Sequence, residues 1–222
     1  MKKRFLGLAV AASVAVSMLG IGTAYAADAS LNVVHGIPGV DVNVCVDGAE
    51  AISDFNPGEV VTGVPLPAGP HDFKIVAVGD TCDDTAILEA TGVELLEGKD
   101  YTAIAHLMED GTPALDVFKN NIKPLDKGSA RLTVRHTAAA PAVDVWANGS
   151  VLLADVPHGA SATMKVPTGV YAAWASLPDD YQPVIGPDVL KLTNGMAYQV
   201  YAWGDSEAGY AFAVVALEVG TK

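Results

Sequence analysis

The chain has 222 residues, a formal net charge of −13 at pH 7 and a hydrophobic content of 50%. An acidic chain repels phosphate backbones and anionic lipid head groups, so its charge argues against nucleic acid as a partner. Its apolar content argues against disorder, and its length allows one large domain or two of about a hundred residues each.

Residues 1–26 have the layout of an export signal. A positive start, Lys2-Lys3-Arg4, precedes the largely apolar residues 5–19, and Ala24-Tyr25-Ala26 fits the small-x-small rule for cleavage. We therefore expect cleavage between Ala26 and Ala27 and a secreted, extracellular protein. An uncleaved membrane anchor is the alternative, but the apolar stretch is short for a span and is interrupted by serine and glycine. No later segment is apolar for long enough to cross a bilayer.

Cys45 and Cys82 are the only cysteines in the chain. Exported proteins fold where thiols oxidise, so we expect the two to form a disulfide. A metal site is the competing interpretation, but two isolated thiols without Cys-x-x-Cys spacing give it little support.

Several segments of the first half reappear in the second half, in the same order and at similar spacing. "LNVVH" returns as "LTVRH", "GVDVNVCVDG" as "AVDVWANG", "VPLPAGPHDFKIVAV" as "MKVPTGVYAAWASL", and "EGKDYTAIA" as "NGMAYQVYA". Pro, Gly and charged residues replace alternating apolar residues between the two sets. The sequence therefore predicts a first repeat at residues 27–122, a linker at 123–129 and a second repeat at 130–222.

The dominant period within each repeat is two, which is typical of β-strands. Leu132, Val134 and His136 share one strand face, whereas Thr133 and Arg135 share the other, which we expect to be solvated. Asp-Gly and Asn-Gly turn signals separate the runs. We predict an all-β protein with two tandem antiparallel β-sandwich domains, because a single sheet would leave its apolar face uncovered.

These motifs resemble domain-of-unknown-function family 4397. The resemblance rests on a strand ending in His, then "PAVDV", an Asn-Gly or Asp-Gly turn, a Pro-x-Gly before an aromatic-containing strand, and a Gly-x-x-Tyr strand. Both halves are similar to the family, which implies bacterial, extracytoplasmic units with Ig-like or prealbumin-like sandwich folds and no assigned activity. The first half departs from the pattern in its longer Cys45 strand and its extra "DTCDDT" loop.

His35 and His136 take equivalent positions, and each is followed by a loop and an aspartate, Asp41 or Asp144. A His held by an Asp can act as a general base. We instead expect a structural role, in which a core His beside its Asp fixes the following loop by hydrogen bonding, because each His continues the inward face of its strand. No Gly-x-Ser-x-Gly nucleophile motif accompanies them.

Other candidate sites have simpler explanations. The remaining histidines are scattered and predict no metal site. Asp80, Asp83 and Asp84 form an acidic loop that is a weak calcium candidate, since Asp is also an ordinary turn residue. Asn148-Gly149-Ser150 matches the N-glycosylation pattern, but the same residues are explained by a hairpin turn.

Aromatic residues gather in the second repeat, which contains every tryptophan of the chain. Trp146, Trp203 and Tyr210 are candidates either for ligand binding or for packing between the domains. Trp146 should point away from the core formed by Val143 and Val145.

We therefore expect a non-enzymatic, exported module that binds or bridges an extracellular protein or envelope glycan, without a cofactor. Two linked copies can raise avidity for a repetitive target. An extracytoplasmic hydrolase with a His–Asp site and a purely structural spacer are the alternatives.

Overall fold

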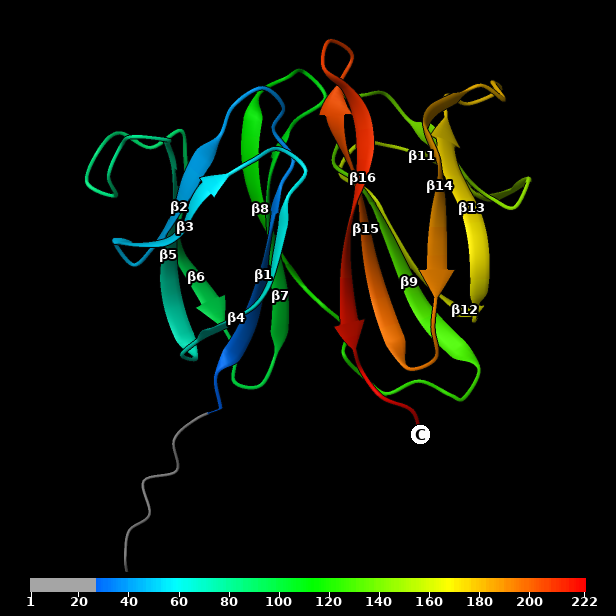
Figure 1. Ribbon diagram of the computed structural model, residues 1–222, viewed down its shortest axis with the longest axis horizontal. Helices are drawn as coiled ribbons and strands as arrows, with labels where there is room; N and C mark the ends of the chain where they lie inside the picture. Colours follow the sequence, from blue (N-terminus) through cyan, green and yellow to red (C-terminus); the bar gives the residue numbers. More distant parts are fainter. Residues whose placement is uncertain (1–26) are drawn as a thin grey trace, which may run out of the picture.

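A computed structural model describes residues 27–222, and the expected export signal and the amino side of its cleavage site lie outside them. Every regular element in the described part is a β-strand (Figure 1). The predicted all-β class is therefore confirmed, with two sandwich-like halves. No helix within residues 27–222 has the length and apolar character needed to cross a membrane.

The first half contains eight strands in two four-stranded sheets. The inner sheet has the order β4-β1-β7-β8 and the outer sheet the order β3-β2-β5-β6. The strands are β1 (Ala29–His35), β2 (Val42–Val46), β3 (Ala49–Phe55), β4 (Val60–Leu66), β5 (Gly69–Ala77), β6 (Leu88–Leu95), β7 (Asp100–Leu107) and β8 (Pro113–Lys119).

The second half repeats this arrangement strand for strand. Its inner sheet has the order β12-β9-β15-β16 and its outer sheet β11-β10-β13-β14. The strands are β9 (Ser129–His136), β10 (Val143–Ala147), β11 (Ser150–Val156), β12 (Ser161–Pro167), β13 (Gly169–Ser176), β14 (Pro183–Leu192), β15 (Met196–Asp205) and β16 (Gly209–Glu218).

One feature of the pairing differs from a purely antiparallel sandwich. β1 pairs with β7 in parallel, and β9 pairs with β15 in the same way. Such a pair needs a long connection, and here the connection forms the four outer-sheet strands and one edge strand of the inner sheet, β4 or β12. The shared exception supports a common topology for the two halves.

Each half has its own apolar core between its two sheets. In the first half, β-branched and aromatic side chains such as Val33, Val44 and Phe73 fill this space. In the second half Leu132, Val145 and Val200 belong to the equivalent core. The alternation of strand residues therefore builds two interiors rather than one.

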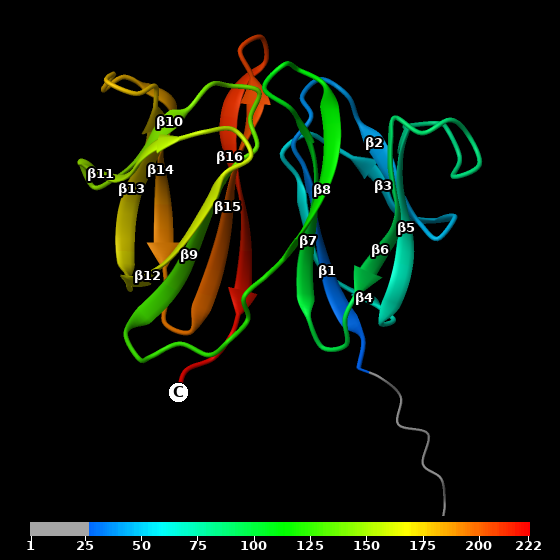
Figure 2. The same ribbon diagram turned by 180° about the vertical axis from the view of Figure 1, so that it is seen from behind.

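The two inner sheets face each other across a seam, and the two outer sheets lie on opposite sides of the molecule (Figures 1 and 2). A third apolar cluster joins Val34 and Ile104 of the first half to Tyr201 and Val215 of the second. Arg135 places its guanidinium 4.0 Å from the ring centre of Phe118 across this seam. Each such contact removes inner-sheet surface from water.

The expectation that one face of strand 132–136 is solvated is wrong. Thr133 and Arg135 are 3% and 9% exposed, because the second sandwich turns this face toward the first. β7 is buried along its whole length for the same reason. Period two correctly predicted the strands, but it could not show that a second sandwich covers their other face.

Residues 120–128 connect the two halves and lie along the edge of the second one. The amide of Leu125 donates to the Gly220 carbonyl at 3.1 Å, and the amide of Lys222 donates back to Leu125 at 2.8 Å. Leu125 is buried with Ala197 and Val219. The connection is thus held by hydrogen bonds and apolar packing over part of its length.

Candidate functional site

The two equivalent histidines hold the loops that follow them. His35 Nε2 donates to the Val40 carbonyl at 2.7 Å, and His136 Nε2 donates to the Pro141 carbonyl at 2.8 Å. Both side chains are fully buried. Burial lowers the pKa of both histidines, although the bonds to these carbonyls oppose the shift. A buried, neutral histidine that bonds a backbone carbonyl favours a role in loop geometry over proton transfer with a substrate.

The aspartates expected beside these histidines make other contacts. Asp41 is exposed, and its backbone carbonyl accepts the amide of Val78. Asp144 Oδ1 accepts the amide of Asp155 at 2.7 Å. Asn43 Oδ1 accepts the amide of Asp54 in the same way, so Asn43, not Asp41, is the counterpart of Asp144. The proposed His35–Asp41 and His136–Asp144 bonds are therefore not formed.

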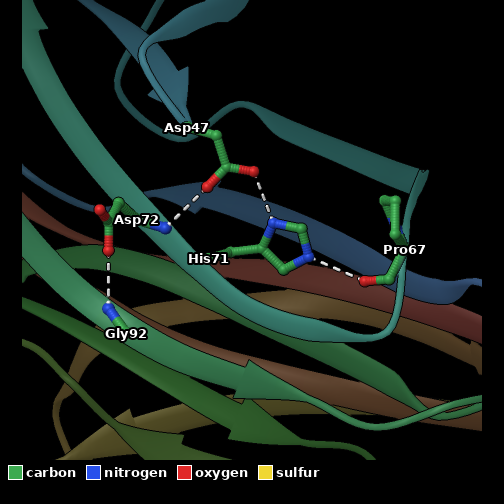
Figure 3. Close-up of polar contacts among 5 residues, drawn as sticks. All are labelled: Asp47, Pro67, His71, Asp72 and Gly92. Carbon is green, nitrogen blue, oxygen red and sulfur yellow. Dashed lines mark hydrogen bonds and ion pairs between the residues drawn. The ribbon is translucent and has the colours of Figure 1, made fainter.

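The structure instead joins His71 to Asp47 in the outer sheet of the first half (Figure 3). His71 Nδ1 donates to Asp47 Oδ2 at 2.7 Å, and His71 Nε2 donates to the Pro67 carbonyl at 2.8 Å. Asp47 Oδ1 accepts the Asp72 amide at 2.9 Å. Asp72 in turn accepts the amide of Gly92 through Oδ1 at 2.7 Å. This network ties the β2–β3 turn, strand β5 and strand β6 together.

Both ring nitrogens of His71 face acceptors, which favours the doubly protonated ring. Burial lowers the pKa of His71, but the hydrogen bonds to Pro67 and Asp47 raise it overall. The Asp72 amide and the His71 ring lower the pKa of Asp47. His71 is buried and both of its ring nitrogens are engaged, by Asp47 and by the Pro67 carbonyl (Figure 3), so the geometry supports a structural ion pair.

The second half repeats two of these hydrogen bonds with neutral groups. Asn148 Oδ1 accepts the amide of Ala172 at 2.8 Å, as Asp47 accepts the amide of Asp72. The hydroxyl of Tyr171 donates to the Pro167 carbonyl at 2.9 Å, as His71 does to Pro67. Asn148 also adopts a positive φ of 49°, close to the 51° of Asp47. This turn role accounts for Asn148 without a sugar.

A second histidine–carboxylate contact lies near the seam. His106 Nε2 donates to Asp116 Oδ2 at 3.0 Å within the inner sheet of the first half. The ring of His158, from the second half, lies 5.8 Å from that of His106 and 5.7 Å from that of His136. His158 Nδ1 donates to the Ala138 carbonyl. These side chains connect the two halves.

Cys45 and Cys82 form the predicted disulfide, with their Cα atoms 5.8 Å apart. The bond fastens the β5–β6 loop to the outer face of the outer sheet. Lys74 Nζ donates to the Cys82 carbonyl at 2.7 Å on that same face. Sulfur and ammonium groups thus hold this loop against the sheet.

The acidic loop suggested as a calcium site uses one of its carboxylates internally. Asp84 Oδ2 accepts both the amide and the hydroxyl of Thr81 at 2.8 Å. Those two bonds lower the pKa of Asp84, and the nearby Lys74 lowers it further. Across residues 27–222, no three or more His, Cys, Asp or Glu side chains are grouped so as to hold a metal ion.

The three candidate aromatic residues do not form one patch. Trp203 lies at the seam, where its side chain contacts Gly36 and Gly58 of the first half. Tyr210 donates its hydroxyl to the Ala139 carbonyl and packs beside Phe212 within the second half. Trp146 belongs to the outer sheet and lies away from both. Of the three, Trp203 is the one that packs between the halves.

Trp146 forms part of an aromatic cluster that includes two further residues. Its ring stacks on Trp174 with centres 5.6 Å apart and planes 4° apart, and Tyr181 tilts against it at 5.4 Å. Trp146 Nε1 donates to Ser176 Oγ at 3.0 Å. Tyr181 is 76% exposed, so the cluster extends from a buried indole to an open phenol ring.

A small surface cavity of about 90 Å³ opens beside this cluster, and we call it the outer hollow. Its walls come from strand β10, strand β11 and the β13–β14 loop. They are formed by Asp144, Trp146, Val151, Asp179, Asp180 and Tyr181. None of the ion pairs within the described residues involves the three aspartates of the hollow. Aromatic walls and unpaired carboxylates can hold a ligand through ring contacts and oxygen acceptors.

Sequence reasoning identified Trp146 but did not identify the hollow. Trp174 and Tyr181 join Trp146 because β10 pairs with β13, placing Trp146 directly opposite Trp174, and because the following loop carries Tyr181. Aligning the two repeats gives a usable signal: Trp146 and Trp174 stand where the first half has Cys45 and Lys74, which are also paired. Large aromatic residues at both positions indicate that the outer face of this sheet differs between the two halves.

In structural class, the chain is a pair of four-plus-four-stranded β-sandwiches that pack through their inner sheets. The sequence of residues 29–146 matches the profile described as "Domain of unknown function (DUF4397)", which is more than half of the chain. The protein belongs to this family. The matched stretch begins with β1 and ends at Trp146 in β10.

No curated protein sequence matches the chain. Among solved structures, "The Bacillus anthracis TIE protein" is similar over 83% of this chain, with 14% sequence identity and a TM-score of 0.23. The chain spans 34% of the length of that protein.

Proposed function

We propose that this protein is an exported, extracellular binding module, built from two tandem copies of the family's sandwich, and that it acts without catalysis. It binds or bridges an envelope glycan or an extracellular protein at the bacterial cell surface. The layout of residues 1–26 supports export, with cleavage between Ala26 and Ala27. The Cys45–Cys82 disulfide is consistent with an oxidising compartment.

Shared strand order and shared side-chain roles support the proposal of two copies. His35 and His136 hold equivalent loops, and the backbone bonds of Asp47 and His71 have counterparts at Asn148 and Tyr171. Duplication explains why unrelated residue types perform one role at matching positions. The inner sheet of the first copy packs against the inner sheet of the second and buries it.

The outer hollow is the observation that carries the binding proposal. It combines an exposed ring, Tyr181, with a buried indole that is fixed by the Ser176 hydroxyl. A rigid aromatic wall loses little conformational entropy when a ligand covers it. Strands β10 and β11, which supply walls of the hollow, belong to the outer sheet on the side away from the seam (Figure 2), where an external partner can approach.

The two copies do not offer equal surfaces, so binding is assigned to the second copy alone. The first copy has the disulfide and Lys74 on the corresponding face. Avidity from two identical sites is therefore not part of the proposal. If the protein bridges two partners, one of them binds at the outer hollow and the second binds elsewhere on the molecule.

Retention on purified bacterial envelope tests the proposal. We expect the chain from Ala27 to Lys222 to co-sediment with envelope fragments or to bind an array of envelope glycans and surface proteins. Tyr181→Ala should reduce binding about fivefold or more, because a single aromatic contact with a ligand contributes about 1 kcal/mol. Val189→Ala removes a side chain that is 78% exposed on the same sheet, and it should bind like the unaltered chain.

Equal binding by Tyr181→Ala and Val189→Ala contradicts the assignment of the outer hollow. An absence of binding to every envelope fraction favours the structural spacer.

A further inference from the structure

The chemistry of the outer hollow identifies a class of ligand for the proposed binding function. Its walls contain two aromatic side chains, Trp146 and Tyr181, and three carboxylates, Asp144, Asp179 and Asp180. Aromatic faces and carboxylates both attract positive charge, and together they are the usual environment of an organic ammonium group. A neutral ligand gains only hydrogen bonds from three unpaired acids and an anion is repelled by them, whereas a cation also gains their charge.

The carboxylates are positioned by the backbone while retaining free oxygen atoms. Asp144 Oδ1 accepts the amide of Asp155, and Asp180 Oδ1 accepts the amide of Gln182 at 2.9 Å. The second oxygen of each has no protein partner in the hydrogen bonds of the described residues. Asp179 is held at a positive φ of 62° in the same loop. Backbone amides therefore orient the carboxylates of Asp144 and Asp180 before any ligand arrives, and the loop backbone places Asp179 beside them.

The first copy supplies an internal comparison that points to a cation. Its equivalent loop is also acidic, with Asp80, Asp83 and Asp84, but there the chain provides its own ammonium group. Lys74, paired opposite Cys45, extends to this loop and donates to the Cys82 carbonyl. Its charge also lowers the pKa of Asp84.

The second copy keeps the acidic loop but replaces the lysine with Trp174. Trp146 stands where the first copy has Cys45, and the disulfide is replaced by ring contacts with Tyr181. No lysine or arginine of the described residues forms an ion pair with the acids of this loop. In the first copy the Lys74 ammonium group lies beside the acidic loop. In the second copy no cation takes its place, and aromatic rings border the acids instead.

We propose that the outer hollow binds an organic cation, specifically a methylated ammonium head group or a substituted amine carried by an envelope component. The inference rests on the proposed binding function and specifies its ligand. The head group contacts the faces of Tyr181 and Trp146, and Asp144, Asp179 and Asp180 balance its charge. A cavity of about 90 Å³ limits the site to a head group rather than a whole sugar ring.

Choline and its neutral carbon analogue, 3,3-dimethyl-1-butanol, test this inference because they share a shape and differ in charge. Tryptophan fluorescence of the chain from Ala27 to Lys222 is titrated with each compound, with sodium chloride as the control for ionic strength. We expect choline to give a saturable change and to bind about tenfold more tightly than the alcohol.

Three variants assign the effect to the hollow. Tyr181→Ala should weaken choline binding about fivefold or more, and the double variant Asp179→Asn/Asp180→Asn should weaken it by a similar factor at low salt. Asparagine keeps the bond to Gln182 and tolerates the positive φ of Asp179, so the double variant preserves the loop. Asp188→Asn, an exposed acid of β14, is the matched control and should have no effect.

Equal binding of choline and the alcohol, no saturable binding of choline, or unchanged binding in the double variant overturns the inference. Envelope binding measured on the same variants separates the two proposals. If Tyr181→Ala abolishes envelope binding while choline fails to bind, the binding function stands and the cationic ligand is wrong. If choline binds as expected but envelope does not, the head-group site stands and the envelope partner is wrong.

Discussion

The two sandwiches share one topology but stabilise it with different chemistry. In the first, a disulfide and an ion pair fasten the outer-sheet loops, through Cys45–Cys82 and Asp47–His71. In the second, stacked rings and neutral hydrogen bonds hold the same places, through Trp146, Trp174 and the Asn148 amide. The fold requires a link at each of these positions, and it does not prescribe which residues form it.

The outer faces of the two sandwiches also differ in how much aromatic surface they expose. A disulfide closes the outer face of the first copy, whereas aromatic packing in the second copy leaves Tyr181 exposed beside a cavity. Covalent closure restricts a loop without offering a contact surface. Aromatic closure holds a loop and presents rings to a ligand as well. The same structural position therefore presents exposed aromatic surface in the second half alone, where we propose that it binds a ligand.

Removal of the disulfide should produce the largest difference in stability between the two sandwiches. Cys45→Ala/Cys82→Ala should destabilise the first sandwich by about 4 kcal/mol, because the bond closes a long loop in the unfolded chain. Trp203 contacts the first half at the seam, so the test is made in a Trp203→Phe background, where the fluorescence of Trp146 and Trp174 reports the second half and far-UV circular dichroism reports both. Urea titration should show the circular dichroism transition moving to lower urea ahead of the fluorescence transition.

Addition of a thiol reductant to the Trp203→Phe chain with both cysteines intact is the matching control and should have the same effect. Coincident movement of both transitions by the full amount would mean that the seam makes the two halves unfold as one unit. That outcome would remove the independence on which the comparison depends.

The sequence was sufficient to predict the strands, the two sandwich-like halves and the disulfide, because each leaves a local signal. Alternation such as Leu132, Val134 and His136 marks a strand whatever covers it. The cysteine pairing follows from the presence of two cysteines in a chain whose first 26 residues have the layout of an export signal. Contacts between distant segments left no such signal, so the bond between Asp47 and His71 was not foreseen.

The candidate site was predicted only in part, for physical reasons. The pairing of His35 with Asp41 assumed that aspartates aligned by the Val-Asp-Val letters keep one role, but the β1–β2 and β9–β10 loops have equal length, so Asn43 takes the position of Asp144. Trp146 was recognised as pointing out of the core. Its partners Trp174 and Tyr181 could not be identified before the pairing of β10 with β13 was known.

An intermediate effect is expected at the second copy's turn. Asn148→Ala should cost about 2 kcal/mol, because alanine is strained at a φ of 49° and cannot accept the amide of Ala172. Asn148→Asp reproduces the residue of the first copy, keeps the acceptor and should cost far less. Urea unfolding followed by tryptophan fluorescence measures both. Equal losses for the two variants would contradict the claim that an acceptor at this turn is what the fold requires.

The smallest effect should distinguish the charged network from its neutral counterpart by its dependence on pH. Because the folded chain raises the pKa of His71 above 6.5, protonation of this ring contributes stability that is fully present below pH 6.5 and is lost as the pH rises through the folded value. Asp47, whose pKa is lowered from 3.8, limits the contribution on the acid side, where it disappears as the carboxylate is protonated.

His71→Tyr substitutes the residue that the second copy uses at this position, and its hydroxyl can donate to Pro67 as Tyr171 donates to Pro167. The unaltered chain should therefore lose more stability than the variant between pH 5.5 and pH 8, by less than about 1 kcal/mol because Asp47 is half exposed. Urea unfolding followed by circular dichroism at both pH values measures the difference. The buried histidines His35 and His136, whose lowered pKa values act in the opposite direction, are present in both proteins and cancel. An identical pH dependence in the two proteins would show that the ion pair contributes no more than the neutral bonds that replace it.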